Sequence, residues 1–220
     1  MSRKVVVVNA GVSAASSTRL LAEQLAGAVL TGVSARGEQA DIEYVDVAPL
    51  ARDLATAVTS GVSSQAVRTA HDAIAGADGL IVATPVFAAS YSGIFKMFFD
   101  TLDPDALTGV PVSIAATAGT ARHSLVLDYA IRPLMAYLRA DALPTGTFAA
   151  TDDFGSPELG ARINRAGSEL AARLVSDGAV AGFGGPTDTK SAPRRSGRST
   201  DLGPFPDFAD LLHGHTGDVK

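Results

Sequence analysis

The sequence predicts an α/β protein in which a doubly wound parallel sheet of five strands is covered by helices on both faces. Short β-branched runs alternate along the chain with amphipathic stretches, which is the pattern of repeated βα units. Of the 220 residues, 46% are hydrophobic and 19% are charged, a composition typical of one compact domain with a sizeable core. We expect this domain to span residues 1–178.

Five runs have the composition of strands. Only the second run has charged residues interspersed along it, at Asp41, Glu43 and Asp46, and this predicts an edge strand. We interpret Asp46 as an acidic residue of that edge strand and assign it no role in a binding site. The predicted strands cover residues 4–9, 41–46, 79–84, 110–116 and 142–148.

The segments between these runs have helical periodicity. Apolar residues recur at spacings of three or four, so that they lie on one helical face that can pack against the sheet. Ser156 as N-cap, Pro157 at the first helical position and Glu158 in the first turn mark the start of the last helix. The predicted faces comprise Leu21, Leu25 and Val29; residues 66–75; Ile94, Phe95, Phe98, Phe99 and Leu102; Leu127, Ile131, Leu134 and Leu138; and Leu159, Ile163, Ala166, Leu170 and Leu174.

The composition changes near Gly178, after which glycine, proline, serine and arginine dominate. Such a segment cannot bury enough apolar surface to fold alone, so residues 179–220 are expected to form a flexible C-terminal tail. Apolar residues return at Leu202, Phe205, Phe208, Leu211 and Leu212. This part of the tail is a possible docking segment, either for the protein's own body or for another chain.

Charge and composition exclude several classes of function. A net charge of −5 and an isoelectric point near 5.3 give no electrostatic reason to expect nucleic acid or a membrane surface as a partner. Cysteine is absent, and the histidines lack the spacing of metal ligands, so no metal site is predicted. The apolar run over residues 5–8 is too short for a signal peptide. We therefore expect a cytoplasmic protein that binds small molecules or other proteins.

A loop of small residues follows the first strand and leads into a helix that is expected to open at Arg19. Unpaired amides at a helix start attract an anion, and hydroxyl groups add donors, so the loop is a candidate phosphate site. An ordinary Ser/Thr cap on a tight turn explains the same residues equally well. The motifs GxxxxGK[ST] and GxGxxG are absent, which disfavours a P-loop nucleotidase and a dinucleotide Rossmann site. The candidate phosphate ligands are Gly11, Ser13, Ser16, Ser17 and Thr18.

Two further loops are expected at the same edge of the sheet. In doubly wound sheets, ligands bind outside the carboxyl ends of the strands, at the switch point between the first and third strands. An apolar turn there suits a flat ring, backbone amides can hold a ring carbonyl, and Arg122 can stabilise negative charge. Alternatively, Phe87 belongs to the core, and Lys96 and Arg122 are ordinary solvated residues. The candidate ligands are Pro85, Val86, Phe87 and Tyr91 in one loop, and Thr117, Ala118, Gly119, Thr120 and Arg122 in the other.

Over residues 4–175 the chain resembles the NADPH-dependent FMN reductases. The most specific segment runs from Thr84 to Lys96 and is similar to the family's flavin motif T-P-x-Y-x-x-S-x-S-G-x-x-K. A second segment combines Ala116 to Thr120 with His123, Asp128-Tyr129 and Pro133. This chain departs from the family at Phe87, where tyrosine is more usual, and at Ala118, where a second glycine is common.

The resemblance implies a flavodoxin-like fold with strand order 2-1-3-4-5 and an enzyme that binds FMN and either NADPH or NADH. Hydride would pass from nicotinamide C4 to flavin N5, with no catalytic side chain, and reduced FMN would supply a flavin-dependent monooxygenase. Two alternatives share the fold: a flavodoxin-type electron carrier, and an NAD(P)H quinone or azo-dye reductase.

The helix expected over residues 124–138 contains Pro133, which removes a backbone hydrogen bond. Tyr129, Met135 and Tyr137 lie beside the sheet-facing stripe and give the helix more apolar surface than one face needs. We expect an irregular helix that contributes to a homodimer or homotetramer, as the resembling reductases do. A kinked helix on a monomer, with its aromatic residues partly exposed, is the alternative.

Overall fold

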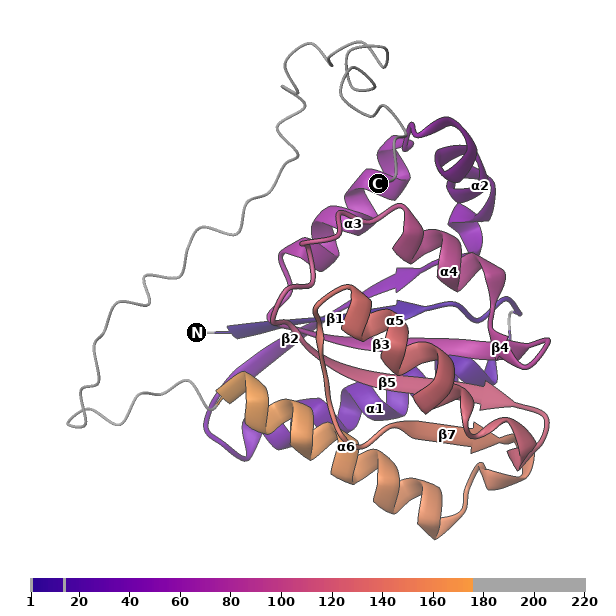
Figure 1. Ribbon diagram of the computed structural model, residues 1–220. Helices are drawn as coiled ribbons and strands as arrows, with labels where there is room; N and C mark the ends of the chain where they lie inside the picture. The colour runs from indigo at the N-terminus through magenta and orange to yellow at the C-terminus, as the bar shows by residue number, and fades with distance from the viewer. Residues whose placement is uncertain (1, 14, 176–220) are drawn as a thin grey trace, which may run out of the picture. The chain divides into compact units, whose positions relative to one another are not determined.

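The computed structural model describes residues 2–13 and 15–175. Figure 1 shows a twisted sheet with α1 and α6 on one face and α2, α3, α4 and α5 on the other, so the predicted doubly wound α/β class is confirmed. The helices are α1 (Ser17–Ser34), α2 (Ala51–Ser60), α3 (Gln65–Ala75), α4 (Gly93–Asp100), α5 (Arg132–Tyr137) and α6 (Pro157–Val175). The predicted tail over 179–220, with its docking segment, lies outside the described residues.

Within the described residues the sheet has seven strands, so the predicted number of five was wrong. Parallel strands run in the order β2-β1-β3-β5-β6, with β7 also paired to β5 and β4 paired antiparallel to β3. The charged second strand lies at an edge, as predicted. The strands are β1 (Ser2–Asn9), β2 (Gln39–Asp46), β3 (Gly79–Phe87), β4 (Ser90–Tyr91), β5 (Pro111–Ala118), β6 (Asp141–Ala142) and β7 (Thr147–Ala150).

The strand predicted over 142–148 is interrupted between β6 and β7. The Leu143 amide still donates to the Val112 carbonyl at 2.9 Å, but the Thr145 amide donates to the Glu169 carboxylate at 3.0 Å instead of to β5. The Arg132 guanidinium donates to the carbonyl oxygens of Ala142, Leu143 and Pro144 at 3.3, 2.8 and 3.1 Å. One arginine side chain thus binds the backbone where the strand is interrupted.

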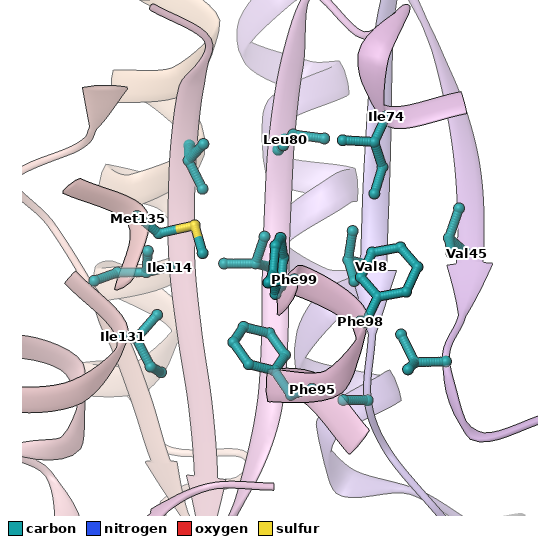
Figure 2. Close-up of a cluster of buried hydrophobic side chains, with 14 of the residues drawn as sticks. Val8, Val45, Ile74, Leu80, Phe95, Phe98, Phe99, Ile114, Ile131 and Met135 are labelled. Atoms are coloured by element: carbon teal, nitrogen blue, oxygen red, sulfur yellow. The ribbon is translucent and has the colours of Figure 1, made fainter. Parts of the chain in front are cut away.

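The core has two layers, one on each side of the sheet. Figure 2 shows the layer under α4, where the rings of Phe95, Phe98 and Phe99 pack against Val8 and Leu80 of the sheet. The ring centroids of Phe95 and Phe99 are 4.8 Å apart, and those of Phe98 and Phe99 are 5.4 Å apart. Burial of each phenylalanine contributes roughly 1.5–3 kcal/mol, so this helix is firmly anchored below the loop that precedes it.

The predicted irregularity near Pro133 is confirmed. Leu127–Ile131 form a π-helical turn, and α5 begins directly after it, with Pro133 in its first turn. A proline is tolerated there because first-turn amides need no intrahelical acceptor. Helix α2 was not predicted. Its buried residues are only Leu54 and Ala57, too few for a clear periodic face.

Helices α1 and α6 cross closely on the second face, which generates a stability prediction. A Cβ at Gly167 would lie 2.5 Å from the Cβ of Ala28, whereas a Cβ at Gly27 of α1 would meet nothing within 4 Å. We expect Gly167→Ala to lower the free energy of unfolding by about 1–3 kcal/mol through overpacking. The control Gly27→Ala should raise it by about 0.5–1 kcal/mol. Urea unfolding measures both, and equal effects would contradict the close approach.

Candidate functional site

Three loops leave the sheet side by side at its carboxyl edge. Asn9 of β1 pairs in register with Ala83 of β3, and the Ala10 amide donates to the Ala83 carbonyl at 2.9 Å. On the other side of β3, Pro85 pairs with Thr117 of β5. Because β1 has β2 on one side and β3 on the other, this edge is the switch point of the sheet.

The first loop ends in a capped helix start. Helix α1 begins at Ser17, two residues before the predicted Arg19, because Ser16 is its N-cap: the Ser16 hydroxyl accepts from the Arg19 amide at 3.2 Å. Ser13 and Ser17 are exposed, and neither hydroxyl has a hydrogen-bond partner in the part of the chain that the structure describes. The loop therefore combines the amides of a helix N-terminus with two unengaged hydroxyls, which together suit an anion.

Gly11 provides space in this loop. A Cβ at this position would lie 2.0 Å from the Ser16 hydroxyl oxygen, which is far closer than non-bonded atoms approach. The Gly11 amide donates to the side-chain oxygen of Asn9 at 3.1 Å. The absence of a side chain at residue 11 therefore leaves room for the Ser16 side chain in its present position.

Thr18 connects the first loop to the third. Its side chain is 2% exposed, and its hydroxyl lies 2.6 Å from that of Thr117, which is itself buried. One of the two hydroxyls donates this hydrogen bond, and the other keeps its own hydrogen. Residues 99 positions apart in the chain are thus directly bonded where the first and third loops begin.

The second loop is a β-hairpin between β3 and β4. Its turn consists of Ala88 and Ala89, with φ angles of 48° and 68°, which are the positive values that a type I′ turn requires at both central residues. Alanine pays roughly 1–2 kcal/mol for each such conformation. Phe87, just before the turn, is 49% exposed, so the alternative that it belongs to the core is wrong.

The base of this hairpin is closed by Thr84 and Ser92, two residues of the flavin-like motif. The Ser92 amide donates to the Thr84 hydroxyl at 3.0 Å, and the Ser92 hydroxyl accepts from the Phe95 amide at 3.4 Å and so caps α4. Val86 packs against the core, and the half-buried ring of Tyr91 lies 5.7 Å from that of Phe95. The hairpin is therefore fixed at its base and exposed at its tip.

The third loop is short and carries little side-chain bulk. Gly119 and Thr120 are exposed after β5 ends at Ala118, and a Cβ at Gly119 would meet nothing within 4 Å. Arg122 lies in the following 3₁₀ turn and is exposed, with no ion pair to any described residue. Among residues 2–13 and 15–175, no cluster of metal-ligating side chains is present, and no helix is long and apolar enough to cross a membrane.

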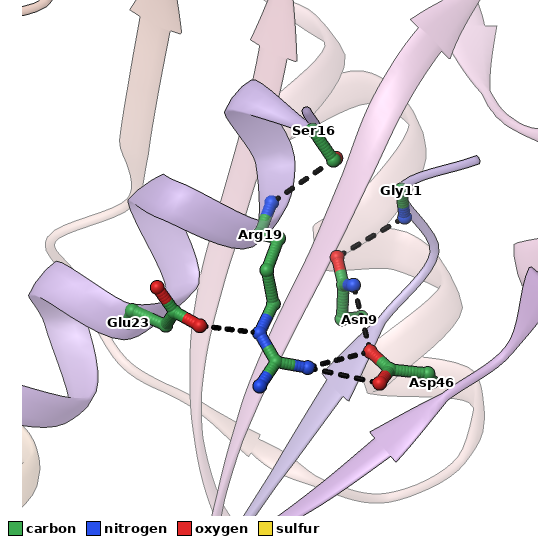
Figure 3. A network of polar contacts seen from close by, with 6 residues as sticks. All are labelled: Asn9, Gly11, Ser16, Arg19, Glu23 and Asp46. Carbon is green, nitrogen blue, oxygen red and sulfur yellow. Dashed lines mark hydrogen bonds and ion pairs between the residues drawn. The ribbon is translucent and has the colours of Figure 1, made fainter. Parts of the chain in front are cut away.

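Sequence reasoning missed a polar network beside the first loop, shown in Figure 3. Asn9 donates to Asp46 at 2.9 Å, and Arg19 donates to both oxygens of Asp46 at 2.7 and 2.9 Å. Arg19 also binds Glu23 at 2.7 Å and lies 4.0 Å from the centroid of the Tyr44 ring. Partial burial disfavours the charge, but hydrogen bonds to Glu23 and Asp46 raise the pKa of Arg19 above its ordinary value.

Comparison with known proteins assigns the chain to a family. A model of the NADPH-dependent FMN reductases matches residues 3–155. An FMN reductase (NADPH) from Pseudomonas aeruginosa is 40% identical over 177 residues, which cover 78% of this chain and 91% of that protein. The NADH-dependent FMN reductase SfnF from Pseudomonas putida is 37% identical over 156 residues, covering 71% and 82%.

A solved structure agrees with these relatives. The crystal structure of an oxidoreductase from Corynebacterium diphtheriae superposes with a TM-score of 0.77 at 53% sequence identity, and the alignment covers 80% of this chain and 98% of that one. The matched family region contains all three loops at the carboxyl edge. On these grounds, the chain belongs to the NADPH-dependent FMN reductase family.

Proposed function

We propose that this protein is an NAD(P)H-dependent FMN reductase that binds its flavin at the three loops of the carboxyl edge. The observation that carries the proposal is the arrangement of this edge: a helix N-terminus with unengaged hydroxyls, an exposed apolar hairpin and a small-residue loop, all at the switch point of the sheet. Family membership supports the same activity. The products of reduction would serve a flavin-dependent monooxygenase.

The donor set fits a flavin phosphate. Ser13, Ser16, Ser17 and the first amides of α1 would hold it, with Gly11 providing the space that the loop needs. The Arg19 guanidinium is bound by Asp46 and Glu23, so the proposed phosphate donors are neutral groups aided by the helix dipole. Thr18, beneath the loop, would support the site through Thr117.

The other two loops fit a flat ring. Pro85, Val86 and the exposed Phe87 would flank it, with Tyr91 as the anchor of the hairpin, and the amides of Ala118, Gly119 and Thr120 would face its pyrimidine edge. Arg122 has a free guanidinium, within the described residues, to stabilise negative charge there.

The role of this chain is to bind FMN and the nicotinamide nucleotide and to orient them toward each other. FMN, when bound, supplies the chemistry, since its N5 accepts a hydride from reduced nicotinamide. The protein holds the two nucleotides in contact, and proximity with correct orientation lowers the barrier. None of the described loop residues needs to act as an acid, base or nucleophile. The relatives include both NADH- and NADPH-dependent enzymes, so we propose no preference between the two donors.

Steady-state kinetics test the activity. With excess FMN, the purified protein should oxidise NADPH or NADH over many turnovers, followed as loss of absorbance at 340 nm under anaerobic conditions with a chemical acceptor for the reduced flavin. A single-electron carrier would bind FMN but oxidise neither nicotinamide continuously. Absence of turnover with both donors, in a protein that binds FMN, would contradict the proposal.

The phosphate placement is tested by comparing two N-cap serines. Ser16 caps α1 in the proposed phosphate loop, and Ser64 caps α3 outside the three loops. Replacing either with alanine should cost about 1 kcal/mol of stability. Only Ser16→Ala should also weaken FMN binding, by roughly tenfold or more, because it removes a charge-assisted hydrogen bond. Riboflavin, which has no phosphate, should bind both variants like the wild type; equal losses for FMN and riboflavin would remove Ser16 from the phosphate site.

We also propose that the irregular helix over residues 124–138 contributes to a homo-oligomer. Three of its large apolar side chains are exposed in the single chain: Leu125 by 61%, Tyr129 by 79% and Tyr137 by 80%. Together they make a surface that a second copy of the chain would cover. Tyr129 lies within the π-helical turn over Leu127–Ile131. Met135, which was also expected at this surface, is instead buried in the core.

Light scattering at micromolar concentration should therefore give a dimer or tetramer mass. Tyr129→Asp combined with Tyr137→Asp should dissociate it without unfolding the subunit. The matched control is Val62→Asp after α2, a position that is 68% exposed and should leave the mass unchanged. A monomeric mass for the wild type would decide against the proposal.

A further inference from the structure

We infer that Asp46 is a positioning residue for the phosphate loop, which it restrains at both ends although it lies on a different strand. The inference rests on the proposed flavin site. Asp46 is the last residue of the edge strand β2 and pairs in register with Asn9, the last residue of β1. The loop that follows β1 ends at Ser16, the cap of α1.

The first restraint acts through Asn9, which is 4% exposed. A carboxylate can only accept hydrogen bonds, so the Asn9 amide must turn its NH₂ group toward Asp46, where the N–O distance is 2.9 Å. Its oxygen consequently faces the loop and accepts from the Gly11 amide at 3.1 Å. Asp46 thus determines which end of the Asn9 amide the loop meets, and with it the turn at Gly11.

The second restraint acts through Arg19. The Nη1 nitrogen of Arg19 donates to both oxygens of the Asp46 carboxylate at 2.7 and 2.9 Å, and the Arg19 amide donates to the Ser16 hydroxyl at 3.2 Å. Figure 3 shows both chains of contacts meeting at Asp46. Asn9, before the loop, and Arg19, after it, are therefore both bonded to the Asp46 carboxylate. These bonds hold the loop in its conformation before any ligand binds.

The negative charge of Asp46 by itself would weaken phosphate binding, whereas its restraint of the loop would strengthen it. Asp46 carries a negative charge beside a site proposed for a dianion, so removal of that charge should strengthen FMN binding if the residue acted only through its field. If it acts by positioning, removal should weaken FMN binding. The sign of the change therefore separates the two roles.

The test measures dissociation constants for FMN and riboflavin, together with KM and kcat, in Asp46→Asn and two controls. Glu23→Gln removes the other carboxylate bound to Arg19, and Glu43→Gln removes the ion pair with Lys4 that links the same two strands at 2.8 Å. We expect Asp46→Asn to raise the FMN dissociation constant and KM by roughly five- to twentyfold, with kcat and riboflavin affinity unchanged. Both controls should stay within about twofold of the wild type.

FMN binding by Asp46→Asn that equals or exceeds the wild type would overturn the inference, as would equal losses for FMN and riboflavin. If instead the wild type showed no preference for FMN over riboflavin, the phosphate placement itself would fail. Should Asp46→Asn fold poorly, Arg19→Lys replaces it, because this variant keeps the positive charge beside the phosphate site but loses the guanidinium that pairs with Asp46 and Glu23 together. FMN affinity should fall while riboflavin affinity stays unchanged, and unchanged FMN affinity in Arg19→Lys would overturn the inference.

Discussion

The parallel pairing of β1, β3 and β5 is the constraint on which the rest of the molecule depends. Because these strands point the same way, residues far apart in the chain reach one edge together, and the hydroxyl pair of Thr18 and Thr117 shows how close they come. Parallel strands must be covered on both faces, which accounts for two core layers and for the close crossing of α1 and α6. The same packing forms the candidate site, because the three loops lie at the edge where the strands end and the next helices begin.

The segments with a clear apolar periodicity, and the helix start marked by capping residues, were predictable from the sequence. Buried β-branched runs and apolar faces predicted the layers, and Ser156 followed by Pro157 located the start of α6. The interruption between β6 and β7 was missed because the side chains that bind the backbone there, Arg132 and Glu169, reach it only through three-dimensional proximity. The start of α1 was misplaced because Ser13, Ser16 and Ser17 are equivalent cap residues by type, and only the folded loop distinguishes them.

The candidate site was predictable as a set of loops but not as a set of contacts. Small residues and hydroxyls at strand ends indicated where a nucleotide would bind. Asn9 and Asp46 carried a weaker signal: each ends a strand at the carboxyl edge, but their pairing depends on β2 lying next to β1. Asp46 was interpreted as a mere edge acid for that reason, since composition marks an edge strand without saying what its last residue touches.

The two-residue turn at Ala88 and Ala89 constrains how this protein can vary. The turn fixes the register in which Phe87 lies opposite Ser90. One inserted or deleted residue would shift that pairing by one position and turn each side chain to the other side of the ribbon. The hairpin should therefore accept glycine or asparagine at its tip, which suit positive φ, far more readily than any change of length. Across related chains, the number of residues between Thr84 and Ser92 should vary less than their identity.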